Sequence, residues 1–219
     1  MDQKFAVIFD MDGVIVDSNP YHKEAWLQFC KKYEVELKEE DVAKSIYGKT
    51  NEAALKEIFK KDFTPEEADR MGEEKEAIYR ELHQKDMVPL KGLISFLQKL
   101  KENNIPTAVA TNAPLSNLDF ILEHIQIKQY FDELIYAKMV SKGKPDPEIY
   151  LKAAEKLNTP PSRCIVMEDS TTGVEAGLRA GMKVVALTTT HSPEELAHTH
   201  LVIPDFENLT PKKLASLLD

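Results

Sequence analysis

The sequence predicts an α/β protein in which a doubly wound parallel sheet carries an inserted helical unit. Beyond residue 89, short apolar runs alternate with helical patterns, a spacing that favours right-handed crossovers between parallel strands. A further apolar run, Phe5–Phe9, is typical of a strand of the same sheet, although a long stretch with helical patterns separates it from the others. Ligands bind beyond the carboxyl ends of the strands in such sheets, so the inserted unit would cover the site.

The segment Phe5–Phe9 leads directly into two acidic residues. Its aromatic and β-branched residues are typical of a strand that is buried on both faces. Asp10 and Asp12 point the same way if the extended backbone continues, and Gly13 allows a sharp turn after them. Two carboxylates this close repel each other unless a cation or a proton lies between them. An ordinary acidic loop is the structural alternative.

The inserted unit is predicted to be helical throughout. The segment Ser18–Pro20 predicts a helix start, with a capping side chain followed by a proline early in the first turn. Apolar residues then recur at three- and four-residue spacing. Asn51–Phe59 predicts another helix, and Thr64–Glu67 has the pattern of a capping box that opens a further one. The expected division is a helical cap over residues 15–88 and a catalytic core over residues 1–14 and 89–219.

The core half alternates strand and helix patterns. The expected strands, besides the first, are residues 106–111, 134–137, 164–167, 183–187 and 201–203. The expected helices are residues 92–101, 115–124, 147–157, 173–180 and 211–218.

Composition excludes several classes of partner. The 219 residues carry a formal net charge of −9, which argues against a nucleic acid or an anionic membrane surface. No apolar run is long enough for a transmembrane helix, and the first residues lack a signal-peptide pattern. Cys30 and Cys164 are too few and too far apart for a disulfide framework or a zinc site. We therefore expect a cytoplasmic protein with two buried free thiols, and its acidic surface favours a monomer.

Polar residues stand at the carboxyl ends of several predicted strands. Thr111 and Asn112 follow the second strand, Lys142 and Lys144 lie in the loop after the third, and Glu168–Asp169 follows the fourth. Each has a structural alternative, since Thr111 could cap a helix, Lys144 could be solvated, and Glu168–Asp169 could complement a helix dipole. Their joint position at one edge of one sheet indicates a site.

The chemistry that suits this set is phosphoryl transfer through an aspartyl-phosphate. A carboxylate such as Asp10 can attack phosphorus, but it needs a cation to approach a phosphate dianion. Mg²⁺ prefers oxygen ligands, and Asp10, Asp169 and Glu168 are the expected donors. Asp12 would then protonate the leaving oxygen and later deprotonate water. The residues expected to balance charge and donate a hydrogen bond to the transferring group are Lys144 and Thr111.

Four segments in this order resemble the motifs of the haloacid dehalogenase-like superfamily: Asp10–Val14, Thr111–Asn112, Gly143–Pro145 and Glu168–Ser170. The resemblance spans the whole chain. It implies a Rossmann-like core with a helical cap, a nucleophilic Asp10, an acid/base Asp12 and bound Mg²⁺. It also implies that the Asp12 carbonyl is a metal ligand. The backbone N–H groups expected to contact the phosphate are those of Thr111, Asn112 and Ala113.

Within the superfamily the chain most resembles the beta-phosphoglucomutase-like branch, on the basis of Tyr21, His22 and Trp26. In that mutase a short cap segment after a glycine carries an arginine that holds the second phosphate of the substrate. In the comparable segment here, Tyr47–Asn51, Asn51 stands in place of the arginine, and an amide offers neither a fixed charge nor a bidentate fork. This favours a phosphatase of small phosphate esters, most plausibly sugar phosphates, with the mutase as the alternative. The cap residues expected to contact substrate are Lys49, Asn51, Lys75 and His22. His22 is alternatively expected to orient Asp12, and an ordinary residue of a surface helix is its structural alternative.

Three other interpretations fit less well. Gly48–Thr50 resembles the end of a P-loop, but Ala43 stands where that motif needs glycine, and a preceding strand is absent from the pattern. A dehalogenase of the same fold would need neither Asp12 nor a metal site. A phosphoaccepting receiver module, the non-enzyme alternative, would be shorter, would carry its aspartate on a later strand and would lack the helical insertion.

Overall fold

A six-stranded parallel sheet forms the centre of the part that the computed structural model describes, residues 5–219 without the side chains of residues 39, 40, 43 and 44. Its strand order is β3-β2-β1-β4-β5-β6, and every neighbouring pair is parallel. The predicted fold class is therefore confirmed. The strands are β1 Ala6–Phe9, β2 Thr107–Ala110, β3 Glu133–Ile135, β4 Cys164–Glu168, β5 Lys183–Leu187 and β6 Leu201–Ile203.

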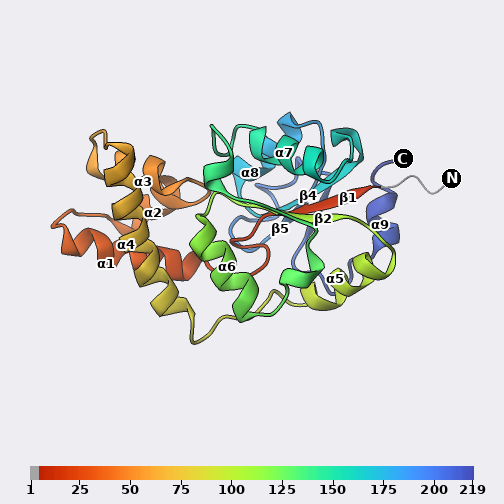
Figure 1. Ribbon diagram of the computed structural model, residues 1–219, viewed down its shortest axis with the longest axis horizontal. Helices are drawn as coiled ribbons and strands as arrows, with labels where there is room; N and C mark the ends of the chain where they lie inside the picture. Colours follow the sequence, from red (N-terminus) through yellow and green to blue (C-terminus); the bar gives the residue numbers. More distant parts are fainter. Residues whose placement is uncertain (1–4) are drawn as a thin grey trace.

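Helices cover both faces of the sheet (Figure 1). The core helices are α5 Leu93–Glu102, α6 Leu115–His124, α7 Glu148–Lys156, α8 Thr171–Arg179 and α9 Pro211–Ala215, with short 3-10 turns at Lys128–Tyr130, Ala137–Met139 and Pro161–Arg163. In Figure 1, α5, α6 and α9 lie on one side of the sheet, and α7 and α8 lie on the other. The last helix ends earlier than predicted, at Ala215.

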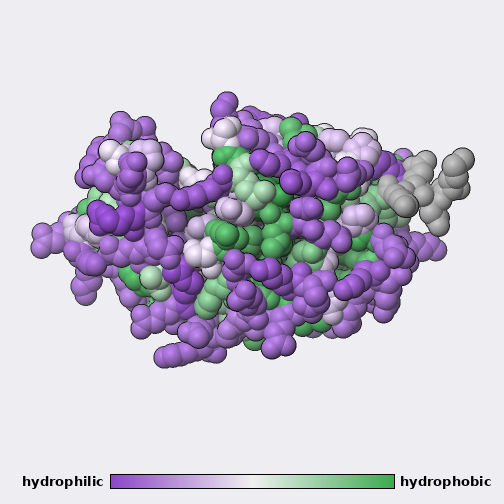
Figure 2. Space-filling model, viewed as in Figure 1, coloured by the Kyte–Doolittle hydropathy of each residue, from purple (hydrophilic) through white to green (hydrophobic). Residues whose placement is uncertain are grey.

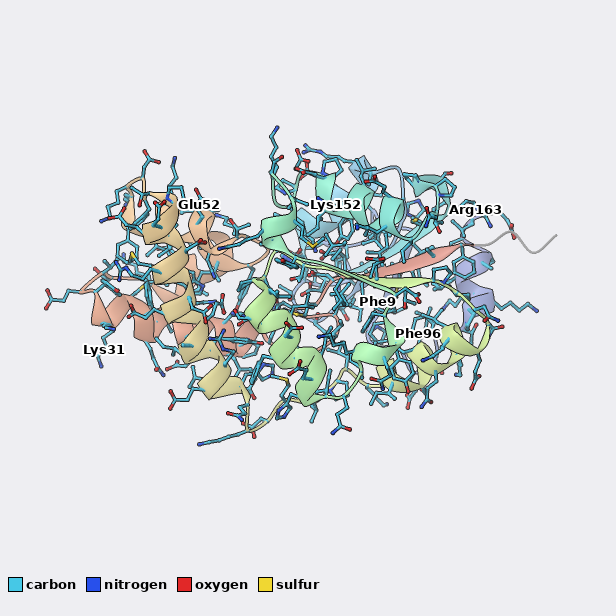
Figure 3. The ribbon with its side chains drawn as sticks, viewed as in Figure 1. Phe9, Lys31, Glu52, Phe96, Lys152 and Arg163 are labelled. Carbon is cyan, nitrogen blue, oxygen red and sulfur yellow. The ribbon has the colours of Figure 1, made fainter. Side chains whose placement is uncertain are left out.

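The central strand β1 divides its side chains between the two layers. Val7 and Phe9 belong to the apolar cluster under α5 and α6, whereas Ala6 and Ile8 belong to the cluster under α7 and α8. The Phe9 ring lies 6.3 Å from the ring of Phe96 on α5, and Figure 3 shows both inside the core. Because all four β1 residues are fully buried, their backbone is held firmly where the strand runs into Asp10.

The helices α1–α4 form a separate unit at the end of the sheet away from both termini (Figure 1). They have their own apolar cluster, which includes Trp26, Phe29, Leu55 and Met71. The helix α2 was not predicted from the sequence. The bounds are α1 Asn19–Lys32, α2 Glu39–Ile46, α3 Asn51–Phe59 and α4 Pro65–His83.

Two adjacent segments connect this unit to the core. Val16 forms isolated bridges with Asp12 and with Pro89, and the Leu90 N–H donates to the Ile15 carbonyl at 2.9 Å. The outgoing and returning chains are thus hydrogen-bonded to each other directly beside the acidic loop. We propose that the cap begins and ends here, at residues 15 and 88.

The outer surface is mainly hydrophilic. Figure 2 shows hydrophilic residues over the cap and most of the core, with hydrophobic residues gathered near the middle of the core on the visible face. Both cysteines are buried and free, as predicted. None of the helices formed by residues 5–219 combines the length and the apolar character needed to cross a membrane.

Candidate active site

The site lies where the carboxyl ends of β1 and β4 meet beneath the cap. The Asp10 N–H donates to the Met167 carbonyl at 2.9 Å, so the ends of these two strands are locked in register. In the sheet, β1 has β2 on one side and β4 on the other. This is the switch point of a doubly wound sheet, where open α/β folds bind ligands.

A buried lysine joins the acidic groups of the two strands. Lys144 Nζ lies 2.7 Å from Asp10 Oδ1 and 2.7 Å from Glu168 Oε1. Burial alone would lower the pKa of Lys144, but the charges of Asp10 and Glu168 outweigh it and raise the pKa. The lysine therefore stays an ammonium group, and it holds the carboxylate of Asp10 in one orientation.

Glu168 is fully buried, and both of its oxygens are engaged. Oε1 accepts from Lys144 Nζ at 2.7 Å and from the Tyr150 hydroxyl at 2.8 Å. Oε2 accepts from the N–H groups of Asp169 and Ser170 and from the Ser170 hydroxyl, at 2.8 to 3.0 Å. We therefore propose that Glu168, predicted as a metal ligand, acts mainly by fixing Lys144.

Asp169 is held by residues that the sequence analysis missed. Its Oδ2 accepts from the hydroxyl of Thr190 and from Asn19 Nδ2 at 3.3 Å, and the hydroxyl oxygen of Thr189 lies 3.4 Å away. The two threonines are the second and third residues after the carboxyl end of β5. A search of the loop beyond this strand end would have found them.

Gly13 is required for the close approach of the two acidic loops. Its φ is +75°, a left-handed conformation, and an added Cβ would lie 1.9 Å from Asp169 Oδ2. The Thr189 hydroxyl also donates to the Gly13 carbonyl at 2.6 Å. A side chain at this position would therefore displace Asp169.

The buried charges of this region are unbalanced in a way that fits a divalent cation. Asp10, Glu168 and Asp169 have oxygens within 4.8 Å of one another, and Lys144 is the cation placed among them. Burial, together with the charge of Glu168, raises the pKa of Asp10 to about 7 despite the opposing effect of Lys144. Burial and the charges of Glu168 and Asp10 also raise the pKa of Asp169 well above its usual value. When all three carboxyl groups are ionised, one ammonium group leaves an excess of two negative charges, which a divalent cation would balance, and hard oxygen donors suit Mg²⁺.

Asp12 is oriented by two donors that reach the same oxygen. Oδ1 accepts from the Ser18 hydroxyl at 2.6 Å and from His22 Nε2 at 3.1 Å. The prediction of a side-chain cap at the start of α1 is wrong, because the N-cap residue Ser18 donates its hydroxyl to Asp12 instead. Burial acts to raise the pKa of Asp12, but His22, then Ser18 and Lys75, outweigh it and lower the pKa.

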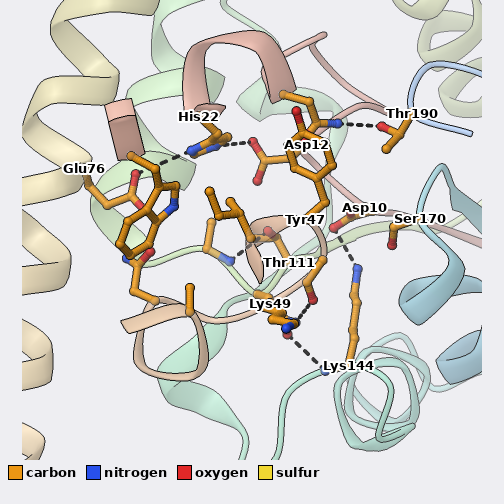
Figure 4. A pocket seen from close by; sticks show the side chains of 18 of the residues that line it. Asp10, Asp12, His22, Tyr47, Lys49, Glu76, Thr111, Lys144, Ser170 and Thr190 are labelled. Atoms are coloured by element: carbon orange, nitrogen blue, oxygen red, sulfur yellow. Dashed lines mark hydrogen bonds and ion pairs between the residues drawn. The ribbon is translucent and has the colours of Figure 1, made fainter. Parts of the chain in front are cut away.

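The tautomer of His22 follows from its second partner. Lys75 Nζ lies 2.9 Å from His22 Nδ1, and an ammonium group can only donate, so Nδ1 accepts and Nε2 carries the hydrogen that reaches Asp12. The imidazole stacks on Tyr79 with ring centroids 3.9 Å apart. Figure 4 shows His22 lying between Asp12 and Glu76. We propose that His22 positions Asp12, which is one of the two roles predicted for it.

The second predicted motif forms the wall opposite the acids. Thr111 Oγ1 accepts from the Ala113 N–H at 3.0 Å, which leaves the hydroxyl hydrogen available to a ligand. Asn112 links the cap to the core, because its Nδ2 donates to the Gly48 carbonyl at 2.9 Å and its Oδ1 accepts from the Lys144 N–H at 3.2 Å.

The cap closes the site from above. The cavity between cap and core is about 70 Å³, well below the roughly 300–1,000 Å³ of typical ligand pockets. A second cavity of about 670 Å³ adjoins it and shares Asn51, Asn112 and Pro114. The predicted site residues that line the smaller cavity are Asp10, Asp12, His22, Lys49, Asn51, Lys75, Thr111, Asn112, Ala113, Lys144 and Asp169.

We expect the stability of the metal-free protein to reveal the unbalanced charge at Asp10. With a pKa of about 7 when folded and 3.8 as the ordinary value, Asp10 binds its proton more tightly in the folded state. The stabilisation that protonated Asp10 gives the folded state is therefore complete below pH 4. It is lost by about 1.4 kcal/mol per pH unit as the pH rises to 7. In EDTA, the free energy of unfolding of Asp10→Asn minus that of the wild type should therefore increase as the pH rises across this range. A constant difference in urea titrations at pH 4.5, 6 and 7.5 would contradict this.

The chain is similar to known proteins in both sequence and fold. The profile of the family described as "Haloacid dehalogenase-like hydrolase" matches residues 7–187. The chain is 32% identical to validoxylamine A 7'-phosphate phosphatase of Streptomyces hygroscopicus subsp. limoneus, over 90% of this chain and 92% of that protein. It is 35% identical to the phosphorylated carbohydrates phosphatase of Thermotoga maritima, over 81% and 82%. The crystal structure of beta-phosphoglucomutase from Clostridium difficile superposes with a TM-score of 0.86 at 30% identity and covers 99% and 97%. The chain therefore belongs to the haloacid dehalogenase-like hydrolase family.

Proposed function

We propose that the protein is a Mg²⁺-dependent phosphatase that hydrolyses a small phosphate monoester, a sugar phosphate, through an aspartyl-phosphate on Asp10. The observation that carries the proposal is the pairing of two differently held carboxylates in one cavity. Asp10 is bound by Lys144, and Asp12 is bound by Ser18 and His22. These different environments suit Asp10 to act as the nucleophile and Asp12 to carry the proton. Relatives that are named as phosphatases of carbohydrate phosphates support the substrate class.

In the first half-reaction, a carboxylate oxygen of Asp10 forms a bond to phosphorus as the bond from phosphorus to the ester oxygen breaks. Asp12 gives its proton to the departing oxygen. Because Ser18 and His22 both hold Oδ1, Oδ2 is the oxygen that carries this proton. A bound phosphate beside Asp12 raises the pKa of the carboxyl, since like charges disfavour ionisation.

In the second half-reaction, Asp12 takes a proton from a water molecule whose oxygen bonds to phosphorus. The bond between phosphorus and Asp10 breaks, which releases inorganic phosphate and restores the Asp10 carboxylate. The Thr111 hydroxyl and the Lys144 ammonium group would stabilise the transferring phosphoryl oxygens.

The metal would be held by the side chains of Asp10 and Asp169, with the Asp12 carbonyl as a further ligand. A bound Mg²⁺ supplies the positive charge that lets a carboxylate and a phosphate dianion approach each other. Thr190 and Asn19 keep Asp169 Oδ2 in place, so this carboxylate is oriented by the chain itself.

The cap favours hydrolysis over the mutase reaction. A mutase must also bind a second phosphate, which demands positive charge on the cap side. The two lysines that the described part of the cap contributes to the cavity wall are both neutralised within the cap. Lys49 forms an ion pair with Glu57, and Lys75 Nζ lies 2.9 Å from Glu76 Oε1. Asn51 lines the cavity without adding charge.

The test is a panel of sugar phosphates with Mg²⁺, assayed both for phosphate release and for isomerisation of glucose 1-phosphate. We expect phosphate release from monophosphates, and its loss in excess EDTA with recovery on adding Mg²⁺. Isomerisation without phosphate release would contradict the proposal and would favour the mutase. Release that continues unchanged in EDTA would contradict the metal requirement.

Introducing a cation at Asn51 should change the substrate preference toward bisphosphates. Asn51→Arg places a guanidinium group on the cavity wall where the wild type has an amide. We expect a sugar bisphosphate to inhibit this variant about tenfold more strongly than the wild type, because Arg pairs bidentately with phosphate. Asn51→Gln, which lengthens the side chain without charge, is the matched control. Equal inhibition constants for the two variants would show that Asn51 does not face the distal part of the substrate.

A further inference from the structure

A buried polar chain runs from the core helix α6, through the cap, to the acid/base. Asn117 Nδ2 donates to Glu76 Oε2 at 2.7 Å, and Lys75 Nζ donates to Glu76 Oε1 at 2.9 Å. The same ammonium group donates to His22 Nδ1, and His22 Nε2 donates to Asp12 Oδ1. We propose that Asn117 and Glu76 are positioning residues that hold Lys75, and through it His22, in the orientation that sets Asp12 for proton transfer. The proposal rests on the function proposed above.

The hydrogen-bonded polar chain is buried, so its members depend on one another. Asn117 is fully buried, and Lys75 and Glu76 are each only 2% exposed. A buried carboxylate and a buried ammonium group are costly unless their hydrogen bonds are made. Glu76 has one oxygen for Asn117 and the other for Lys75, so its carboxylate plane is fixed from two sides. Removing the amide of Asn117 frees Glu76 to turn, and Lys75 turns with it.

The orientation of the Asn117 amide is fixed by chemistry. Its oxygen accepts from Arg80 Nη1 at 2.9 Å, and its nitrogen donates to Glu76. A guanidinium group only donates and a carboxylate only accepts, so the amide cannot be reversed without losing both bonds. Asn117 is therefore a specific partner of α4, and replacing it with another polar residue would disturb these two hydrogen bonds.

Both ends of the chain belong to the core, whereas the middle belongs to the cap. Asn117 is on α6 and Asp12 is on the loop after β1, while His22 and Lys75–Glu76 are on α1 and α4. Figure 4 shows His22 reaching across from the cap side toward Asp12. The cavity of about 70 Å³ is well below the volume of typical ligand pockets, so we expect the cap to move when a sugar phosphate enters. Such a movement would separate Glu76 from Asn117 and His22 from Asp12, and closure would restore both contacts.

The test compares two phosphate esters whose leaving groups differ in their need for an acid. An alkyl phosphate needs a proton from Asp12 as the ester bond breaks, whereas p-nitrophenyl phosphate releases a stable phenolate without one. For Asn117→Ala we expect kcat/KM to fall about tenfold with the alkyl ester and less than about twofold with the aryl ester. Ser116→Ala is the matched control, because the Ser116 hydroxyl joins α6 to Glu73 and Arg80 of α4 without contacting a member of the polar chain. It should leave both values unchanged. An equal loss with both esters, or no loss, would overturn the proposal.

A second variant and a spectroscopic measurement keep the test readable. Glu76→Gln has the same shape and removes the charge, so it should show the same selective loss if Asn117→Ala fails to fold. In the wild type, ¹⁵N spectra of His22 should show an unprotonated Nδ1 and a protonated Nε2. In both variants we expect the two ring signals to move toward each other. Unchanged ring signals in both variants would overturn the proposal. Failure of the wild type to hydrolyse either ester would instead refute the proposed function, and the ring signals would still test the proposal.

Discussion

Replacing Asp10 with asparagine should abolish turnover while the fold is retained. An amide cannot form the bond to phosphorus that a carboxylate oxygen forms, so we expect phosphate release to fall by on the order of 10⁴-fold or more. The side chain keeps its size, and the buried strand β1 that presents it is unaffected. The measurement is kcat for the best sugar phosphate of the panel, with Mg²⁺ present.

The control for this result is the stability of the variant. Because the pKa of Asp10 is raised to about 7, its ionised carboxylate destabilises the metal-free protein at pH 8. Asp10→Asn should therefore unfold in EDTA at a midpoint no lower than that of the wild type. An inactive variant that is also unfolded would say nothing of the nucleophile. A folded variant with substantial turnover would refute the mechanism.

Removing the charge of Lys144 should damage both activity and stability. Lys144→Met keeps most of the volume but leaves Asp10 and Glu168 without the ammonium group that lies 2.7 Å from each. Breaking a buried ion pair from one side costs about 3–5 kcal/mol. We expect kcat to fall by roughly 10³-fold, since the loss combines a misplaced nucleophile with a missing cation at the transferring group.

The matched control is Lys142→Ala. Lys142 lies two residues away on the same loop, and its side chain is exposed. We expect this variant to have the kcat and the unfolding midpoint of the wild type. If Lys142→Ala and Lys144→Met lost activity equally, a general effect on the loop would explain the result, and the specific role of Lys144 would be refuted.

The core of the fold could be predicted from the sequence because its signals are local. A buried parallel strand is a short apolar run, and the run Phe5–Phe9 contains all of β1, Ala6–Phe9. Helix α2 was missed because Glu39–Ile46 is short and its apolar residues, such as Val42, are few. The packing of Val42 against the apolar cluster of the cap holds this helix, and local patterns do not show that contact.

The grouping of the candidate site residues could be predicted for a similar reason. Parallel strands bring their carboxyl ends to one edge, so Asp10, Thr111 and Asp169 could be grouped without knowing the strand order. Charged residues of the cap could not be assigned in this way. Lys75 was expected only to contact substrate, yet it also holds His22, and the link from Glu76 to Asn117 depends on how α4 packs against α6.

The measurement that tests the central claim most directly is chemical trapping of the phosphorylated enzyme. The wild type is mixed with a ³²P-labelled sugar phosphate and Mg²⁺, quenched in acid within the first turnover, and reduced with borohydride, which converts an aspartyl-phosphate to homoserine. The account predicts ³²P on the quenched protein and, after reduction, homoserine at position 10, with neither in Asp10→Asn. Rapid phosphate release with no label on the protein, or homoserine at a different position, would contradict it.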